Sequence, residues 1–146
     1  GDEIMALWGA PKSYGNDAIA AVKAALEMME VLDRFNAERR AKNLIGIDIG
    51  IGLNTGDVIA ANMGSENRMN YTVIGDNVNL GARLEGTNKM YKTHIIISEN
   101  TLREVKDYIY YRELDLIRVK GKNEPVSIYE VVALTPAGEA VQTTRE

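Results

Sequence analysis

The stretch of residues 71–86, YTVIGDNVNLGARLEG, constrains the fold of this chain more than any other. An apolar run ends at Ile74, is broken by Gly75-Asp76, and continues as a helical pattern. Such a junction points the free N–H groups of a helix start at one place. Asn79 and Arg83, four residues apart, share one face near that start. An amide and a guanidinium there favour a phosphate, whereas without the junction such a pair is most often a solvated face.

The composition excludes several kinds of site. Lys and Arg number 17 against 21 Asp and Glu, a net charge of -4, so no general basic field exists for nucleic acid or an anionic membrane. The chain has no Cys and one His, His94, which leaves oxygen ligands and a hard cation. No apolar run approaches the ~20 residues that cross a bilayer, and no signal-peptide pattern is present. We expect a domain that works in the cytoplasm without membrane contact.

Hydrophobic periodicity predicts helices and strands along the rest of the chain. Besides the helix after Gly75, helical spacing covers residues 17–40 and 99–105. Strand patterns cover residues 4–8, 44–53, 58–63, 93–98, 108–119 and 126–134. Residues 64–70 read as a polar loop and residues 135–146 as a polar tail.

The order of these elements predicts how they pair. We expect residues 4–8 to be the far arm of a hairpin that turns at Gly1-Asp2. Residues 44–53 and 58–63 are expected to form a second hairpin through the turn NTGD at 54–57. The predicted fold is an α+β sandwich, mostly hairpins, with helices on one face.

Five further residues are candidates for chemistry, each with a simpler interpretation. Asp2 in a turn can hold Mg²⁺, although an acid in a turn is more often only a turn residue. Thr72 can read a base edge, or it is an ordinary strand former. Lys120 and Lys122 flank a turn glycine from which cations reach a polyphosphate, and Arg68 is a third cation of this kind. Exposed lysines in turns are common.

Four segments in order carry a resemblance: Gly1-Asp2 followed by MALWGAP, then GIGLNTGDVIAANMG, YTVIGDNVNLGARLEG and VKGKNEPVSIYEV. Together they resemble the class III adenylate and guanylate cyclase catalytic domain. The resemblance covers residues 1 to about 133, which correspond to the C-terminal two thirds of the family domain. It implies a ferredoxin-like antiparallel sheet with helices packed on it, the nucleotide cyclase fold, lacking the first strand and early helices. Residues 1–134 would then be a partial cyclase domain and residues 135–146 a tail.

The resemblance also implies roles for the candidate residues. Asp2 is similar to the second of two metal-binding aspartates, and Thr72 to the residue that recognises the purine. Thr at that position resembles the bacterial and bicarbonate-responsive branch. Asn79 is similar to the residue that orients the ribose, and Arg83 to the one that stabilises the transition state at the α-phosphate.

The remaining cations correspond to phosphate contacts in the family. Lys120 is similar to the lysine that binds the terminal phosphates, with Lys122 close enough to exchange with it. Arg68 matches a further phosphate-facing or bicarbonate-facing arginine. The GDE string at residues 1–3 lacks the longer GGDEF pattern of diguanylate cyclases, because Ile4 stands where that family has an aromatic residue.

The resemblance implies conversion of ATP to 3′,5′-cyclic AMP and pyrophosphate, with two Mg²⁺ or Mn²⁺ ions per site. Two like domains pair head to tail, so the expected partners are ATP and a second cyclase domain. The family's first metal aspartate and its purine-selecting lysine lie upstream of Gly1, so we expect the isolated chain to be inactive and prone to swapped association. A guanylate cyclase and a non-catalytic dimerisation or nucleotide-sensing module are the alternatives.

Overall fold

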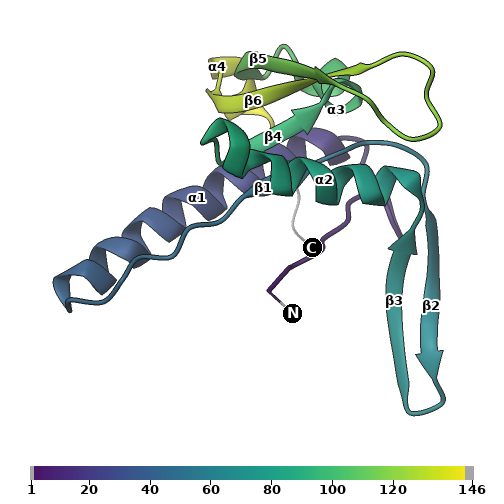
Figure 1. Ribbon diagram of the computed structural model, residues 1–146, viewed down its shortest axis with the longest axis horizontal. Coiled ribbons are helices and arrows are strands. Elements are labelled where there is room, and N and C mark those ends of the chain that lie inside the picture. Colours follow the sequence, from purple (N-terminus) through teal and green to yellow (C-terminus); the bar gives the residue numbers. More distant parts are fainter. Residues whose placement is uncertain (1, 144–146) are drawn as a thin grey trace.

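The computed structural model describes residues 2–143, except for the side chains of residues 68 and 69. In the described part, the chain runs from a long first helix through six strands and two further helices to a short helix near the end (Figure 1). The elements are α1 (Asp17–Ala41), β1 (Ile51–Leu53), β2 (Ile59–Ser65), β3 (Arg68–Ile74), α2 (Asp76–Tyr91), β4 (Ile95–Ser98), α3 (Glu99–Val105), β5 (Ile109–Ile117), β6 (Val126–Leu134) and α4 (Pro136–Ala140). No helix in the described part is both long and apolar enough to cross a bilayer.

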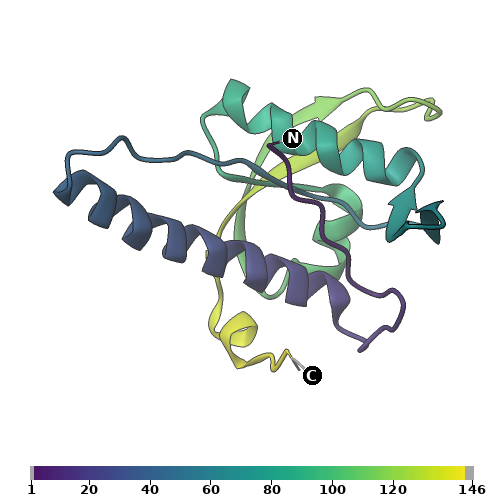
Figure 2. The same cartoon turned by 90° about the horizontal axis from the view of Figure 1, so that it is seen from below.

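A four-stranded sheet in the order β1-β4-β6-β5 forms the body of the molecule. The β1–β4 pair is parallel, and the other two pairs are antiparallel. Successive residues of β4 point to opposite faces, so Ile95 and Ile97 pack with α1 and α3 while Ile96 packs with α2. All residues of β4 are buried because helices cover both faces. The predicted α+β class is confirmed, but the helices lie on two faces instead of one (Figure 2).

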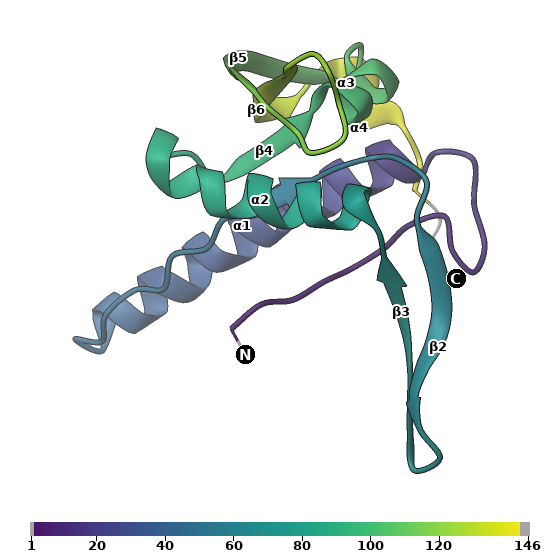
Figure 3. The ribbon, with the colours of Figure 1, turned by 45° about the vertical axis from the view of Figure 1, so that its right-hand side comes forward.

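The two strands β2 and β3 form a separate hairpin that extends away from the body (Figures 1 and 3). The predicted pairing of residues 44–53 with 58–63 is therefore wrong. Only residues 51–53 of the first segment are in a strand, and they use β4 as their partner. The prediction of a polar loop at residues 64–70 is also wrong. These residues contain the end of β2, the hairpin turn and the start of β3. Its polar residues suit an exposed ribbon, and every residue of β2 is exposed.

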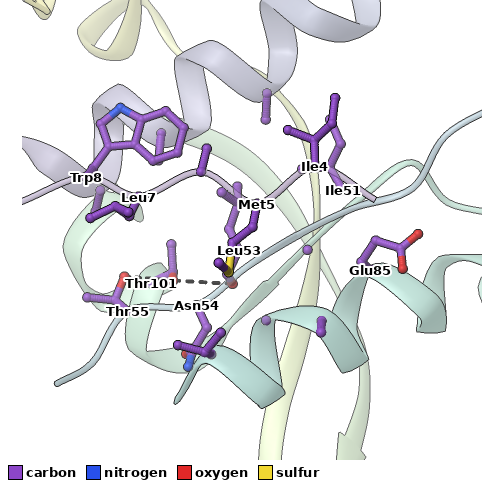
Figure 4. A pocket seen from close by; sticks show the side chains of 18 of the residues that line it. Ile4, Met5, Leu7, Trp8, Ile51, Leu53, Asn54, Thr55, Glu85 and Thr101 are labelled. Atoms are coloured by element: carbon purple, nitrogen blue, oxygen red, sulfur yellow. Dashed lines mark hydrogen bonds between the residues drawn. The ribbon is translucent and has the colours of Figure 1, made fainter. Parts of the chain in front are cut away.

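The N-terminal segment is extended but forms no strand, contrary to the prediction for residues 4–8. A strand needs a hydrogen-bonded neighbour, and no segment within residues 2–143 pairs with this one. It lies instead along a cavity of about 1590 Å³. Ile4, Met5 and Leu7 face this cavity together with Ile51 and Leu53 of β1 (Figure 4).

The C-terminal residues include the helix α4 where the sequence predicted only a polar tail. Thr135 caps this helix by accepting a hydrogen bond from the Gly138 N–H at 3.1 Å, and Pro136 occupies its first turn. Gly138 lies directly on the backbone of Tyr108, where an added Cβ would be 2.0 Å from the carbonyl oxygen. Helix α4 is therefore packed against the backbone just before β5.

Helix α2 lies with its backbone directly on β1. A Cβ added to Gly52 of β1 would be 2.3 Å from the Glu85 nitrogen and 2.4 Å from the Gly81 oxygen. Real Cβ atoms do not approach backbone so closely, so only glycine fits at position 52. This contact fixes the distance between α2 and the edge of the sheet.

A matched pair of glycine substitutions tests this contact. Gly52→Ala is expected to lower the free energy of unfolding by about 1–3 kcal/mol or more, because the helix must move away from the strand. Gly86→Ala in the same helix meets nothing within 4 Å, and it is expected to raise the free energy of unfolding by ~0.5–1 kcal/mol through helix propensity. Urea denaturation of both variants provides the measurement. Equal shifts in the two variants would contradict the close approach.

Candidate active site

The junction between β3 and α2 has the form that the sequence predicted. Gly75 has φ +138, a conformation that side chains disfavour, and it lets the chain turn sharply into the helix. The backbone N–H groups of Val78 and Asn79 donate to the Gly75 oxygen at 3.1 and 3.2 Å. The unpaired N–H groups of the helix start are therefore those of Asp76 and Asn77.

The exposed face of α2 presents Asn79 and Arg83. Both side chains are exposed, whereas Leu80 and Leu84 of the same helix are buried against the sheet. The Arg83 guanidinium donates a hydrogen bond to the backbone oxygen of Arg118, just after β5. Arg83 is thus held at the start of the β5–β6 loop.

That loop carries Lys120 and Lys122, both exposed. Its turn contains Gly121 with φ +81 and is closed by a 3.1 Å hydrogen bond from the Lys122 N–H to the Val119 oxygen. The structure therefore brings the predicted phosphate residues of α2 and of the loop to one side of the molecule. Their combined charge suits a polyphosphate.

The hairpin carries the two other candidates, at different distances from α2. Thr72 is half-buried on β3, opposite Ala61, near the junction. Arg68 pairs with Ser65 next to the hairpin turn, and its side chain lies outside the described part. Four residues of strand separate Arg68 from Thr72, about 13 Å. Arg68 therefore belongs to the far end of a strand and not to the loop that the sequence predicted.

Asp2 lies on a different side of α2 from Asn79 and Arg83. It is exposed and lines the 1590 Å³ cavity, whose α2 wall includes Gly81 and Glu85. Asn79 and Arg83 do not line this cavity. Within residues 2–143 no group of three or more His, Asp or Glu side chains is placed to hold a metal ion. Asp2 could therefore supply one oxygen ligand to a cation whose other ligands come from outside this group of residues.

Comparison with known protein families shows to which family the chain belongs. The model of the adenylate and guanylate cyclase catalytic domain matches residues 1–132, nearly the whole chain. The chain belongs to this family.

Curated relatives of this cyclase chain are much longer than the chain. Adenylate cyclase 1 of Rhizobium meliloti (strain 1021) is 36% identical over 144 residues, 99% of this chain and 21% of the relative. The adenylate cyclase of Anabaena cylindrica is 40% identical over 140 residues, 91% of this chain and 27% of the relative. The cyclase chain thus spans about a fifth to a quarter of the length of these relatives.

Solved cyclase structures share the fold. The adenylyl cyclase CyaB from P. aeruginosa is 35% identical with a TM-score of 0.76, covering 88% of this chain and 66% of that chain. The guanylyl cyclase Cya2 is 36% identical with a TM-score of 0.74, covering 88% of this chain and 64% of that chain. The nucleotide cyclase fold is therefore confirmed, and both nucleotide specificities occur among similar structures.

A second contact joins α2 of the cyclase chain to β5. At the end of α2 the Tyr91 hydroxyl donates a hydrogen bond to the Asp115 carboxylate. This bond lowers the pKa of Asp115, to which the Leu116 N–H also donates at 2.7 Å, and it raises the pKa of Tyr91. With Arg83 bonded to the Arg118 oxygen, α2 is tied to β5 and its loop at two points.

The Tyr91–Asp115 contact predicts a pH-dependent effect. Because the folded pKa of Asp115 lies below its unfolded value, the contact stabilises the fold above the unfolded pKa. This stabilisation is lost as the pH falls through the folded pKa. Tyr91→Phe should therefore raise the Asp115 pKa and lower stability at neutral but not at strongly acidic pH.

Carboxyl NMR titration of Asp115, with urea denaturation at both pH values, measures these effects. Tyr110→Phe is the control, since Tyr110 is an exposed tyrosine of β5 itself. An unchanged Asp115 pKa in Tyr91→Phe would show that the contact does not form.

Proposed function

We propose that the protein carrying this chain is an adenylate cyclase that converts ATP to 3′,5′-cyclic AMP and pyrophosphate. One observation carries the proposal: α2 presents Asn79 and Arg83 on its exposed face, and Arg83 is bonded at the base of the loop with Lys120 and Lys122. An amide, a guanidinium and two ammonium groups on one side match a ribose triphosphate. The net charge of -4 favours a small anion over a polynucleotide.

Each residue then has a defined task. Asn79 hydrogen-bonds the ribose and orients its 3′ oxygen toward the α-phosphate. Arg83 stabilises the charge that develops there as the new P–O bond forms and pyrophosphate leaves. Lys120 and Lys122 hold the terminal phosphates, and Arg68 adds a further phosphate contact. Thr72, with a hydroxyl that donates and accepts, reads the purine edge.

The residues also fit a metal cofactor, Mg²⁺ or Mn²⁺, two ions per complete site. Asp2 would hold the metal as one carboxylate ligand, and nucleotide phosphates would complete the shell. When bound, such ions lower the pKa of the ribose hydroxyl and neutralise the triphosphate. The reaction takes place in the cytoplasm, where the product acts in signal transduction.

The proposed assembly is a head-to-tail homodimer of cyclase domains. Asp2 and Arg83 lie on different sides of α2, so one chain does not bring them together, and a second copy can. The β2–β3 hairpin extends from the body (Figure 3). It carries exposed apolar side chains, among them Ile59, Met63 and Tyr71. An isolated two-stranded ribbon is only marginally stable in water, so this hairpin would gain stability from a partner chain packed against it.

A guanylate cyclase is the second candidate, because the guanylyl cyclase Cya2 is as similar to the chain as the adenylyl cyclase CyaB. Adenylate cyclase is favoured by the names of the curated relatives and by Thr72, which resembles the Thr-type branch. A non-catalytic nucleotide-sensing module is the third. The retention of Asp2, Thr72, Asn79 and Arg83 argues against it, because nothing in the fold requires all four.

Product analysis with ATP and GTP tests the proposed function. In the full-length protein we expect cyclic AMP from ATP, and Arg83→Ala should lower kcat by about 10²–10³-fold, the typical loss when one preorganised donor is removed. Arg103→Ala is the matched control, since Arg103 is an exposed arginine paired with Glu99 on α3, and kcat should stay within about 2-fold.

Other outcomes of this assay separate the alternatives. Cyclic GMP as the main product would make the protein a guanylate cyclase. Turnover that is unchanged by Arg83→Ala would exclude the assigned catalytic role, and the absence of any product from the full-length protein would favour the sensing module.

The 146-residue chain by itself is expected to make no cyclic nucleotide. Its described residues offer Asp2 but no group of three acids or histidines that could hold a metal ion, and its core borders a cavity of about 1590 Å³. The purified chain, assayed with ATP and Mg²⁺ or Mn²⁺ beside the full-length protein, provides the measurement. Robust cyclic AMP production by the isolated chain would overturn this expectation.

A further inference from the structure

A polar cluster joins the first turn of α2 to the end of β1. Asn54, directly after β1, donates from Nδ2 to the backbone oxygen of Asn77 at 2.9 Å and to Asn77 Oδ1 at 3.2 Å. Asn54 Oδ1 accepts from the Ser98 hydroxyl at 2.6 Å. Both hydrogens and the oxygen of the Asn54 amide are therefore used, and they connect α2, β1 and β4.

The Asn77 side chain is held from its other side as well. Its Nδ2 donates to the Asp57 backbone oxygen at 2.9 Å. A Cβ added to Gly56 would be 2.4 Å from Asn77 Nδ2, so the turn backbone lies directly on this amide. Thr55 of the same turn shares a 2.9 Å hydrogen bond with Thr101 of α3 (Figure 4). The turn that follows β1 is thus bonded to α3 through Thr55 and to α2 through Asp57.

This cluster holds a helix start that has no cap of its own. The N-cap residue is Gly75, which has no side chain to accept from the first-turn N–H groups. Farther along, the helix is fixed by the approach of Gly52 to Gly81 and by Asn88, whose Nδ2 donates to the Ile51 oxygen at 3.0 Å. At the start of α2, where Asn79 lies, the side-chain bonds come from the Asn54–Asn77 pair.

The rotation of α2 about its axis decides where its exposed residues point. Positions 77, 81, 84 and 88 follow helical spacing and form one stripe toward the sheet. At about 100° per residue, Asn79 lies about 190° and Arg83 about 130° from the centre of this stripe, so both point away from the sheet. Any turn of the helix about its axis moves both side chains.

We propose that Asn54 and Asn77 are positioning residues that fix the rotation of the α2 start and so aim Asn79 and Arg83 at the nucleotide. This inference rests on the proposed function. Asn77 lies on the inner side of the helix, bonded to Asn54 and to the Asp57 backbone oxygen, so its effect on the nucleotide would pass through Asn79 and Arg83. Loss of the pair should lower kcat far more than it raises KM, since Lys120 and Lys122 bind phosphate from a separate loop.

Two substitutions in the full-length protein test the pair. Asn77→Ala removes the Asn77 amide, and Asn54→Asp keeps the acceptor for Ser98 but loses the donor to Asn77. Each is expected to lower kcat on the order of 10- to 100-fold, the typical effect of misplacing catalytic groups, with KM changed less than about 3-fold. Thr135→Ala is the control, because it also removes two hydrogen bonds, to Asp107 and from Gly138. It should lower thermal stability and leave kcat unchanged.

A mutant cycle distinguishes positioning from general destabilisation. If Asn77 acts through Asn79 and Arg83, Asn77→Ala should lower kcat by less than about 3-fold in a background that carries both Asn79→Ala and Arg83→Ala. A full, additive loss in that background overturns the proposal. If Arg83→Ala itself leaves turnover unchanged, the proposed function fails. If Arg83→Ala lowers kcat and Asn77→Ala does not, only the positioning role fails.

Hydrogen exchange gives a readout that needs no turnover. In the full-length protein, Asn77→Ala should speed amide exchange in residues 76–83 by about 10-fold or more relative to Thr135→Ala, because the start of the helix opens more often. Unchanged exchange in that segment would overturn the proposal even if the protein proved inactive.

Discussion

The contact between Gly52 of β1 and Gly81 of α2 is the constraint on which the rest of the site depends. With no side chain on either residue, the helix backbone lies directly against the strand backbone. Leu84 and Asn88 follow on the same side of the helix and are buried there. Because an α-helix repeats every 3.6 residues, a fixed inner stripe also fixes the outer one. The direction of Asn79 and Arg83 therefore follows from packing on the far side of the helix.

The same helix is joined to the strand that carries the lysine loop. Arg83 is bonded to the Arg118 oxygen and Tyr91 to the Asp115 carboxylate, so α2 is linked to β5 and its loop at two points, near its middle and at its C-terminal end. The loop with Lys120 and Lys122 starts from this linked unit. A phosphate chain bound by the loop would thus lie at a distance from Arg83 that the fold sets in advance, which is what preorganised electrostatic stabilisation requires.

Local signals in the sequence predicted the helices well and the strand pairing poorly. Helical spacing identified α1, α2 and α3. Alternation predicts that a segment is extended but not which segment pairs with it. Residues 44–53 alternate strongly, yet only β1 within them forms a ladder, while β2 pairs with the segment that follows it. The start of α4 at Thr135-Pro136 carried a helix signal that the polar composition of the tail hid.

The same limit applies to the site. The spacing of Asn79 and Arg83 and the glycine junction before them could be predicted because they are local along one helix. The bond from Arg83 to Arg118 joins residues that are 35 positions apart, and the Asn54–Asn77 bonds span 23 positions. No local pattern encodes such contacts. Asn77 sits inside the most informative stretch of the chain, but its role depends on a partner that only the fold brings to it.

The separation of Asp2 from Arg83 is the strongest argument that the site is shared. Asp2 lines the cavity on one side of α2, and Arg83 points away from that cavity toward the β5–β6 loop. In the proposed mechanism the metal carboxylate Asp2 and the transition-state arginine Arg83 act on the same nucleotide, so a single chain would present two incomplete halves. In the proposed head-to-tail pair, the carboxylate half of each chain would meet the arginine half of the other. The projecting β2–β3 hairpin, exposed along all of β2 and carrying Thr72 on β3, lies beside the helix start where such a partner would have to meet it.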